Sequence, residues 1–418
     1  MKENIRTMSE EQELSAFSIA TILLFFAAAL LLASPEELLR GMITIVLTRD
    51  ALVTDYFELT GFGAAFLNAG LVMGLGFLLI RRQKISFTGL SMAVLFINAG
   101  FALFGKNPVN ILPMLFGTWL YARFRHENMN NYIHTALFAS CLAPIVTELV
   151  YLLPFSSAVN LAIAVIVGVL SGFVLPPLSV HTASMHKGYN LFNVGFAAGL
   201  FAFVMVCVLQ SFSLESHNVF IWSYGRPVWL LAGLYLYFAA TLLFGLLPDG
   251  KSLRSLPDLM RHPGRAVTDF VLTEGVSTTL VNMGIMGMLC TTYILLIDGD
   301  LSGPVVGAIL TAFGFAAFGV HARNYLPVLF GVVLSTFINH LELTTPGLQM
   351  GAVFAVGLAP VAGQFGIPAG IVAGMLHAAV VVCTSALYGG LNLYNNGFST
   401  GLVALVLVPV LEIFVKES

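Results

Sequence analysis

Paired amide side chains are the feature of this 418-residue chain with the clearest chemical use. Four asparagines of the first half have counterparts 202 or 214 positions later, and the pairs are Asn68 and Asn282, Asn110 and Asn324, Asn190 and Asn392, and Asn193 and Asn395. An asparagine amide both donates and accepts hydrogen bonds, so these side chains suit contact with a neutral polar solute. Asparagine also caps helix N-termini, and the last two pairs precede long apolar runs. Pore lining and capping both stay open, and all eight residues are candidates for a substrate pathway.

One acidic residue lies within a long apolar run. Glu148 belongs to the run 132–152, and Gln364 stands 216 positions later at the matching place. An ionisable group inside a membrane span is expensive and is a functional candidate by default. We therefore expect Glu148 and Gln364 in the pathway, with Glu148 as a hydrogen-bond acceptor or as the site of a coupling proton. The alternative is that Glu148 lies at the outer interface of the membrane.

The other ionisable residues offer little catalytic chemistry. Asp55 and Asp269 each follow a threonine at the start of an apolar run, which is typical of helix N-caps. His181, His186 and Lys187 form the only local cluster that an intramembrane enzyme could use. The chain has no His-Glu-x-x-His pattern. We expect no catalytic residue, no metal site and no cofactor.

The segments that must position these residues are duplicated. Segment 104–117 recurs at 318–331 with Phe-Gly, Asn, Leu-Pro and Leu-Phe-Gly at the same offsets. Segment 190–196 recurs at 392–398 as Asn-Leu, an aromatic residue, Asn and a final Gly-Phe. Internal duplication of this length in a membrane chain is typical of secondary transporters and of several channels.

The composition predicts an all-α polytopic membrane protein. Hydrophobic residues make up 58% of the chain and charged residues 9%, against about 25% charged in soluble proteins. A helix needs about 20 apolar residues to cross a bilayer. Apolar runs of about this length lie at 15–33, 60–80, 132–152, 158–177, 188–211, 227–248, 273–297 and 392–414. The lipid bilayer is therefore a partner of the chain, and nucleic acid is not.

Charge in the connecting loops predicts two inverted repeats. Lysine and arginine favour cytoplasmic loops, and seven membrane segments per half place most of them inside. The residues this arrangement leaves outside are Arg40, Arg49, Lys106 and Arg226. The loop 81–84 is basic whereas its counterpart 297–300 is acidic, as expected for opposite membrane faces. The odd number of segments per half also inverts the second repeat.

The same arrangement divides the chain into five parts. These are a cytoplasmic tail at 1–14, a first membrane repeat at 15–211, an external linker at 212–226, an inverted second repeat at 227–414 and a cytoplasmic tail at 415–418.

Two apolar segments of each half are short for a full span. Segments 88–103 and 110–121 are separated by Gly, Asn and Pro residues, and 303–317 and 325–338 repeat that layout. A broken helix is tolerated in a membrane where it is buried in protein or lines a polar cavity. Such breaks at matching positions indicate a binding or permeation site. The alternative is a pair of plain loops between spanning helices, so the sequence leaves open whether these segments are re-entrant, half-spanning or complete.

The segments 188–196 and 393–398 resemble an uncharacterised bacterial family of polytopic inner-membrane proteins, known only as a domain of unknown function. That resemblance brings no activity. In layout each half is also similar to the urea transporters, through 65–70 and 279–284 and through 104–117 and 318–331. The Asn-Pro pair of that family is missing after Asn68 and Asn282, and its Tyr-Asn-Gly is missing after Gly105 and Gly319. This second resemblance implies a pathway within each protomer for a small neutral solute and a homo-oligomer, as a trimer or a dimer.

The expected function is transport of a small polar solute, by a channel-like facilitator or a secondary transporter, in a bacterial cytoplasmic membrane with both termini cytoplasmic. The pathway is expected between the two inverted repeats. The alternative is an intramembrane enzyme acting on a lipid or a lipid-linked substrate.

Overall fold

The computed structural model describes residues 9–215, 220–247 and 252–414, and these residues form helices and short connections without a named strand. The first nine α-helices are α1 (Glu10–Leu32), α2 (Pro35–Leu47), α3 (Tyr56–Arg82), α4 (Gly89–Phe101), α5 (Leu112–Phe124), α6 (Ile133–Ala139), α7 (Ala143–Leu152), α8 (Ser157–Met185) and α9 (Asn193–Ser211). The next nine are α10 (Val228–Leu246), α11 (Ser252–Leu259), α12 (Phe270–Leu296), α13 (Gly303–Phe315), α14 (Ala322–Asn339), α15 (Pro346–Phe354), α16 (Ala359–Phe365), α17 (Ile367–Leu387) and α18 (Asn395–Phe414). Short 3₁₀ turns join α6 to α7 and α15 to α16.

Within the described part of the chain, ten helices are long and apolar enough to cross a membrane, so this is a multi-pass membrane protein. Five lie in each half, counting α6 with α7 and α15 with α16 as one continuous span each. Helices α4 and α13 are apolar but shorter, with 13 residues each. They match two of the four segments predicted to be short, 88–103 and 303–317; of the other two, α5 has 13 residues and α14 has 18.

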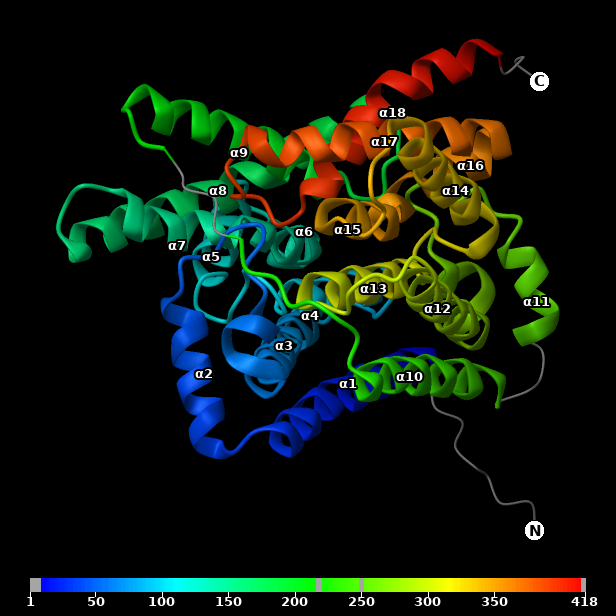
Figure 1. Ribbon diagram of the computed structural model, residues 1–418, viewed down its shortest axis with the longest axis horizontal. Coiled ribbons are helices and arrows are strands. Elements are labelled where there is room, and N and C mark those ends of the chain that lie inside the picture. Colours follow the sequence, from blue (N-terminus) through cyan, green and yellow to red (C-terminus); the bar gives the residue numbers. More distant parts are fainter. Residues whose placement is uncertain (1–8, 216–219, 248–251, 415–418) are drawn as a thin grey trace.

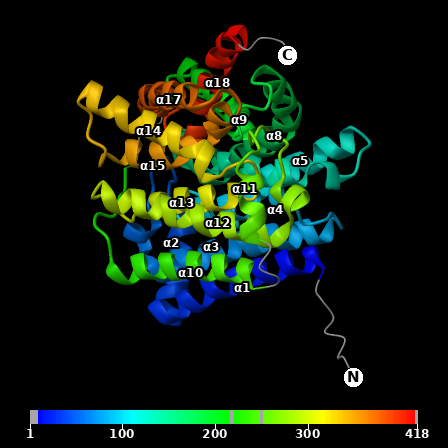
Figure 2. The same ribbon diagram turned by 90° about the vertical axis from the view of Figure 1, so that its right-hand side faces the viewer.

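The order of the elements repeats from one half to the other, and some helix lengths repeat as well. Helices α3 and α12 have 27 residues each, and each is kinked at a glycine with positive φ, Gly61 at 81° and Gly275 at 78°. Asp55 caps α3 by accepting from Phe57 N, and Asp269 caps α12 by accepting from Val271 N. The predicted N-caps are therefore confirmed. Helices α1 and α10 lie along one side of the molecule, and α9, α17 and α18 lie along the opposite side (Figures 1 and 2).

Helices α4 and α13 pack against each other at the centre and run antiparallel. A side chain at Gly100 would meet the Gly307 carbonyl oxygen at 2.5 Å, whereas one at Gly89, at the other end of α4, would meet the Ala317 carbonyl oxygen. Between these contacts the rings of Phe96 and Phe313 meet edge-on at 4.7 Å. Because only glycine allows the two backbones to approach so closely, the crossing depends on these small residues.

The caps also join the two halves. The Asp55 carboxylate accepts from Gly303 N, the first residue of α13, at 3.1 Å. The Asp269 carboxylate accepts from Gly89 N, the first residue of α4, at 3.0 Å. Each aspartate thus satisfies free N–H groups on its own helix and on a helix of the other half, where the helix dipole also favours negative charge.

The boundaries differ slightly from those predicted. Helix α1 begins at Glu10, within the predicted tail 1–14, because Ser9 and Gln12 form a capping box and three glutamates occupy its first turn. Residues 1–8 and the predicted tail 415–418 lie outside the described residues, as do 216–219 of the linker.

Candidate functional site

A cavity of about 510 Å³ lies beside the connection between α8 and α9. Its rim is exposed, since 85% of Val267 and 48% of the Lys187 side chain are accessible. Its floor is buried and aromatic, and the residues there are Phe138, Phe192, Phe318 and Tyr394. The cavity therefore leads from one surface of the protein to the centre, where the two halves meet.

The connection that forms one wall is held by both halves. Gly188, at a φ of 81°, accepts a hydrogen bond from Ala266 N through its carbonyl oxygen. Leu191 N donates to the carbonyl oxygen of Gly357 in the second half. Asn190 Oδ1 accepts from Phe192 N and from Thr400 Oγ1, both at 3.0 Å. These bonds fix an irregular segment whose backbone groups would otherwise be unsatisfied in the membrane.

The polar side chains of the wall are ordered by one another. Asn193 Oδ1 accepts from His186 Nε2 at 2.9 Å and from Thr182 Oγ1 at 2.8 Å. His186 Nδ1 accepts from Asn190 N, so the proton of the neutral ring is on Nε2. Burial lowers the pKa of His186 and the hydrogen bond to Asn193 opposes this in part. On the facing helix α6, His134 Nε2 is 3.1 Å from Ser91 Oγ.

Basic side chains line the cavity, of which Lys187 is charged and His186 is neutral, as described above. His134, His186 and Lys187 line it, and no aspartate or glutamate does so among the described residues. Lys187 Nζ pairs with Glu412 at the rim. Arg265 lies beside it, with Nε 2.6 Å from the Lys187 carbonyl oxygen and the guanidinium over the Tyr189 ring. The cavity mouth is thus a basic environment.

Behind the floor lies a buried polar cluster. The Tyr394 ring meets Phe101 edge-on at 5.3 Å, and Lys106 Nζ lies 5.4 Å from the centre of the same Phe101 ring. Lys106 is 1% exposed and donates to Asn98 Oδ1 at 2.9 Å. Ser140 Oγ also donates to Asn98 Oδ1, at 3.2 Å. One aromatic layer therefore separates the cavity from an ammonium group.

The family model described as "Protein of unknown function (DUF1576)" matches residues 34–211 and 249–413, which together are most of the chain. The chain belongs to this family. The two matched regions fall in the first and the second half and leave out α1 and α10. No curated protein and no solved structure matches the chain.

The predicted pathway asparagines fall into two groups. Asn190 and Asn193 line the cavity, as described above. Their counterparts Asn392 and Asn395 are buried before and at the start of α18. Asn392 Oδ1 accepts from Tyr394 N, and Asn395 Oδ1 accepts from the Tyr388 hydroxyl. Asn190 and Asn392 each accept from the N–H two residues later and brace the turn before the last helix. The capping alternative is wrong for α9, whose N-cap Phe192 has no side-chain cap hydrogen bond.

The other asparagine pairs satisfy the backbone of the helix breaks. Asn68 Nδ2 donates to the carbonyl oxygens of Ala102 and Lys106, and Asn282 Nδ2 donates to those of Ala316 and Val320.

Asn110 and Asn324 close the same turns from the other side. Asn110 Nδ2 lies 3.3 Å from the Gly105 carbonyl oxygen and Asn324 Nδ2 lies 2.9 Å from that of Gly319. Most residues of both breaks are buried, although Val109 is 53% exposed and Arg323 is exposed as well.

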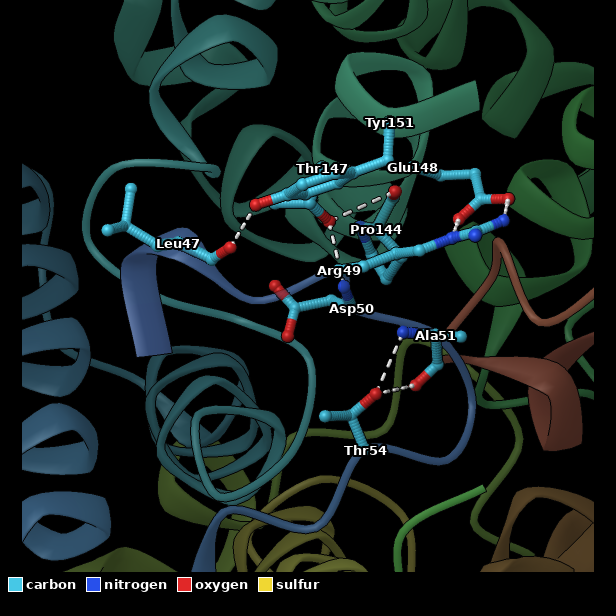
Figure 3. A network of polar contacts seen from close by, with 9 residues as sticks. All are labelled: Leu47, Arg49, Asp50, Ala51, Thr54, Pro144, Thr147, Glu148 and Tyr151. Carbon is cyan, nitrogen blue, oxygen red and sulfur yellow. Dashed lines mark hydrogen bonds and ion pairs between the residues drawn. The ribbon is translucent and has the colours of Figure 1, made fainter. Parts of the chain in front are cut away.

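The structure does not place Glu148 and Gln364 in a common environment. Gln364 is exposed on α16. Glu148, at the buried side of α7, forms a bidentate ion pair with Arg49, with Nη2 2.6 Å from Oε1. In Figure 3 Arg49 reaches across to Glu148, while the Asp50 carboxylate points away from the pair. Asp50 instead accepts from Tyr56 OH at 2.7 Å and from Asn110 Nδ2 at 3.1 Å.

Lys106 was missed as a site residue, and its predicted place in an external loop is wrong. Its surroundings explain why: Asn98 and the Phe101 ring hold the ammonium inside the protein. The repeat gives no clear signal for this, because Lys106 corresponds to Val320 in a break that shares only its first glycine and its last asparagine. The other cluster that sequence singled out is split, since His186 and Lys187 line the cavity and His181 does not. No group of three metal-ligating side chains occurs among the residues described.

Proposed function

We propose that this protein transports a small polar solute across the membrane, along a pathway between two inverted repeats. The observation that carries the proposal is the cavity whose floor lies where the halves meet, next to two buried helix breaks. In secondary transporters, binding sites lie near the membrane midplane at the interface of such repeats and are formed by discontinuous helices.

Three observations support the inversion of the repeats. Helix α4 runs antiparallel to its counterpart α13, as two elements related by a two-fold axis in the membrane plane would. The caps Asp55 and Asp269 act reciprocally on α13 and α4. Five long spans per half is also an odd number, so the second half enters the membrane from the other face.

Equivalent residues of the two halves are open at the cavity and covered at the opposite face, and this difference supports alternating access. Ala266 and Val267 line the cavity, and their counterparts 52–53 on the other side are covered by the linker. Ile221 N donates to the Val53 carbonyl oxygen, and Asp55 N donates to that of Ile221. Ser223 N and Oγ both donate to the Asp55 carboxylate. The described conformation thus resembles one that is open to one face and covered at the other.

The proposal also includes the orientation of the protein in the membrane and the membrane in which it lies. The cavity mouth holds Lys187 and Arg265, and basic loops favour the cytoplasm, so we place the opening and both termini on the cytoplasmic side of a bacterial inner membrane. A homo-oligomer, as in the urea transporters that the layout resembles, is part of the same proposal.

Uptake into liposomes that contain the purified protein tests this function. Urea, small amides, amino acids, nucleobases and small carboxylates would be supplied with and without a proton or sodium gradient. Uptake that only equilibrates would indicate a facilitator, and uptake that needs a gradient would indicate a secondary transporter. Absence of uptake by folded protein would contradict transport and favour the intramembrane enzyme.

A variant of the cavity wall gives the matched control. Ala183 lines the cavity, so Ala183→Trp fills it and is expected to lower uptake at least tenfold. Ala158 is exposed on the same helix α8, and Ala158→Trp is expected to leave uptake unchanged. Equal loss in both variants would show that the cavity is not the route.

A further inference from the structure

Lys106 is a buried cation with unused hydrogen-bonding capacity. Its ammonium has three donors, and one of them is directed at Asn98 Oδ1. Among the described residues no carboxylate forms an ion pair with it, and the buried Asp50 is bonded to Tyr56 and Asn110 instead. A buried amine with unused donors is costly, so its presence suits a partner that the described residues do not supply.

The helix break does not require this charge. Lys106 corresponds to Val320, and Asn98 corresponds to Ala312. The main chain at the two breaks is held alike, because Asn68 donates to the Lys106 carbonyl oxygen at 2.7 Å and Asn282 donates to that of Val320 at 2.8 Å. Since valine suffices in the second half, the ammonium of the first half has a use other than holding the turn.

A second group without a partner among the described residues belongs to the cavity floor. The Tyr394 hydroxyl has no hydrogen-bond partner although Tyr394 is 1% exposed, and the Tyr394 side chain lines the cavity floor. Lys106 and Tyr394 both contact Phe101, since the Tyr394 ring centre lies 5.3 Å and Lys106 Nζ lies 5.4 Å from the centre of its ring. Ser140, next to Cys141, donates to the same Asn98 Oδ1 as Lys106. The main chain links the two segments too, because Leu393 N donates to the Cys141 carbonyl oxygen at 3.1 Å. Two buried hydrogen-bond donors with unused capacity therefore belong to residues that contact the same Phe101 ring.

The entrance of the cavity also favours an anion. Lys187 lines the cavity and Arg265 lies beside it, so among the described residues these cations outnumber the one carboxylate at the rim, Glu412, which pairs with Lys187. A cleft with groups of one sign raises the local concentration of ions of the opposite sign.

We propose that the transported solute is a small monovalent anion, such as a carboxylate, and that it binds to the Lys106 ammonium and the Tyr394 hydroxyl after passing the aromatic floor. This inference rests on the proposed function and names the class of its substrate. Ammonium and hydroxyl groups bind a carboxylate through charge-assisted hydrogen bonds, and the ion in turn neutralises the buried charge. The neutral solute implied by the urea transporter layout would leave that charge unpaired.

The native thiol of Cys141 allows a direct test without knowledge of the solute. In a variant that keeps Cys141 and carries Cys207→Ala, Cys290→Ala and Cys383→Ala, two thiol reagents of similar size are compared, an anionic sulfonatoethyl and a cationic trimethylammonioethyl methanethiosulfonate. We expect the anionic reagent to label Cys141 roughly tenfold faster or more. Lys106→Met should abolish this ratio and Lys106→Arg should keep it. Lys84→Met, in an exposed loop, should not change it.

If Lys106→Met does not fold, the anion site can be tested in protein that keeps Lys106. Sodium acetate should slow labelling of Cys141 by the anionic reagent several-fold, whereas acetamide at the same concentration should not. Uptake of acetate and acetamide into the same liposomes, corrected for liposomes without protein, separates the two proposals. Uptake of acetamide without preference for acetate, or equal labelling by both reagents, would overturn the anion site and leave transport standing. An unreactive Cys141 together with absence of any uptake would overturn both.

Discussion

At the scale of single residues, most buried amides serve the backbone. Asn68 and Asn282 each satisfy two carbonyl oxygens that a broken helix leaves free, in an environment without water. Neither Oδ1 atom has a partner. Asn68 and Asn282, which their pairing in the sequence suggested as pore residues, are therefore explained by the repeated helix break.

Removal of the Asn68 amide should destabilise the fold. Asn68→Leu leaves two buried carbonyl oxygens without a donor, which should cost about 2–4 kcal/mol in the free energy of unfolding. Asn282→Leu should have a similar effect because its bonds are equivalent. Thermal unfolding in detergent measures this. Asn131→Leu, at an exposed position, is the control, and equal melting temperatures for Asn68→Leu and Asn131→Leu would contradict the assignment.

Glu148 should behave as an ion-pair partner and not as a proton carrier. Glu148→Gln leaves Arg49 without its carboxylate and should lower the stability by about 2–5 kcal/mol. The double variant Arg49→Met with Glu148→Met should recover much of that loss, because an apolar pair needs no desolvation of charge. Thermal unfolding reports the stability, and uptake driven by a proton gradient reports the coupling. If the double variant loses gradient-driven uptake while remaining stable, Glu148 is a coupling site after all.

At the scale of elements, the sequence predicted what the repeat encodes locally. Glycine, proline and asparagine placed the helix breaks at Gly105 and Gly319, and a threonine before an aspartate placed the caps Asp55 and Asp269. Contacts between distant segments have no such signal. The ion pair of Glu148 with Arg49, 99 residues away, and the burial of Lys106 depend on how α2, α4 and α7 pack together. A lysine beside a glycine normally marks an exposed loop, so its position could not be predicted from sequence.

The crossing of α4 and α13 should tolerate no side chain larger than hydrogen. A Cβ atom at Gly100 would lie 2.5 Å from the Gly307 carbonyl oxygen, so Gly100→Ala must separate the two halves at their centre. We expect a lower melting temperature and reduced uptake. Gly233 of α10 has no atom near its Cβ position, and Gly233→Ala should be neutral or should stabilise the helix by up to about 1 kcal/mol. Similar melting temperatures for the two alanine variants would show that the crossing is looser than described.

At the scale of the whole molecule, reciprocal contacts join the two halves. Asp55 caps α13, Asp269 caps α4, and Asn190 of the first half accepts from Thr400 of the second. Because these contacts cross between the halves, neither half completes its own helix ends or its own cavity wall. A shared core of this kind is suited to two alternative packings about the central crossing, which a transporter needs.

The inverted arrangement predicts opposite membrane faces for one pair of equivalent residues. Lys84 follows α3 and Asp298 follows α12, 214 positions apart, and both are exposed with a left-handed backbone, at φ values of 55° and 60°. In a background without native cysteines, a membrane-impermeant thiol reagent should label Asp298→Cys in intact cells. Lys84→Cys should react only after the membrane is permeabilised. Labelling of both variants from the same side would mean that the halves are parallel, and the pathway between inverted repeats would then have to be abandoned. Opposite labelling would instead place the basic cavity mouth on the same face as Lys84, since α4 begins directly after that loop and its Leu90 lines the cavity.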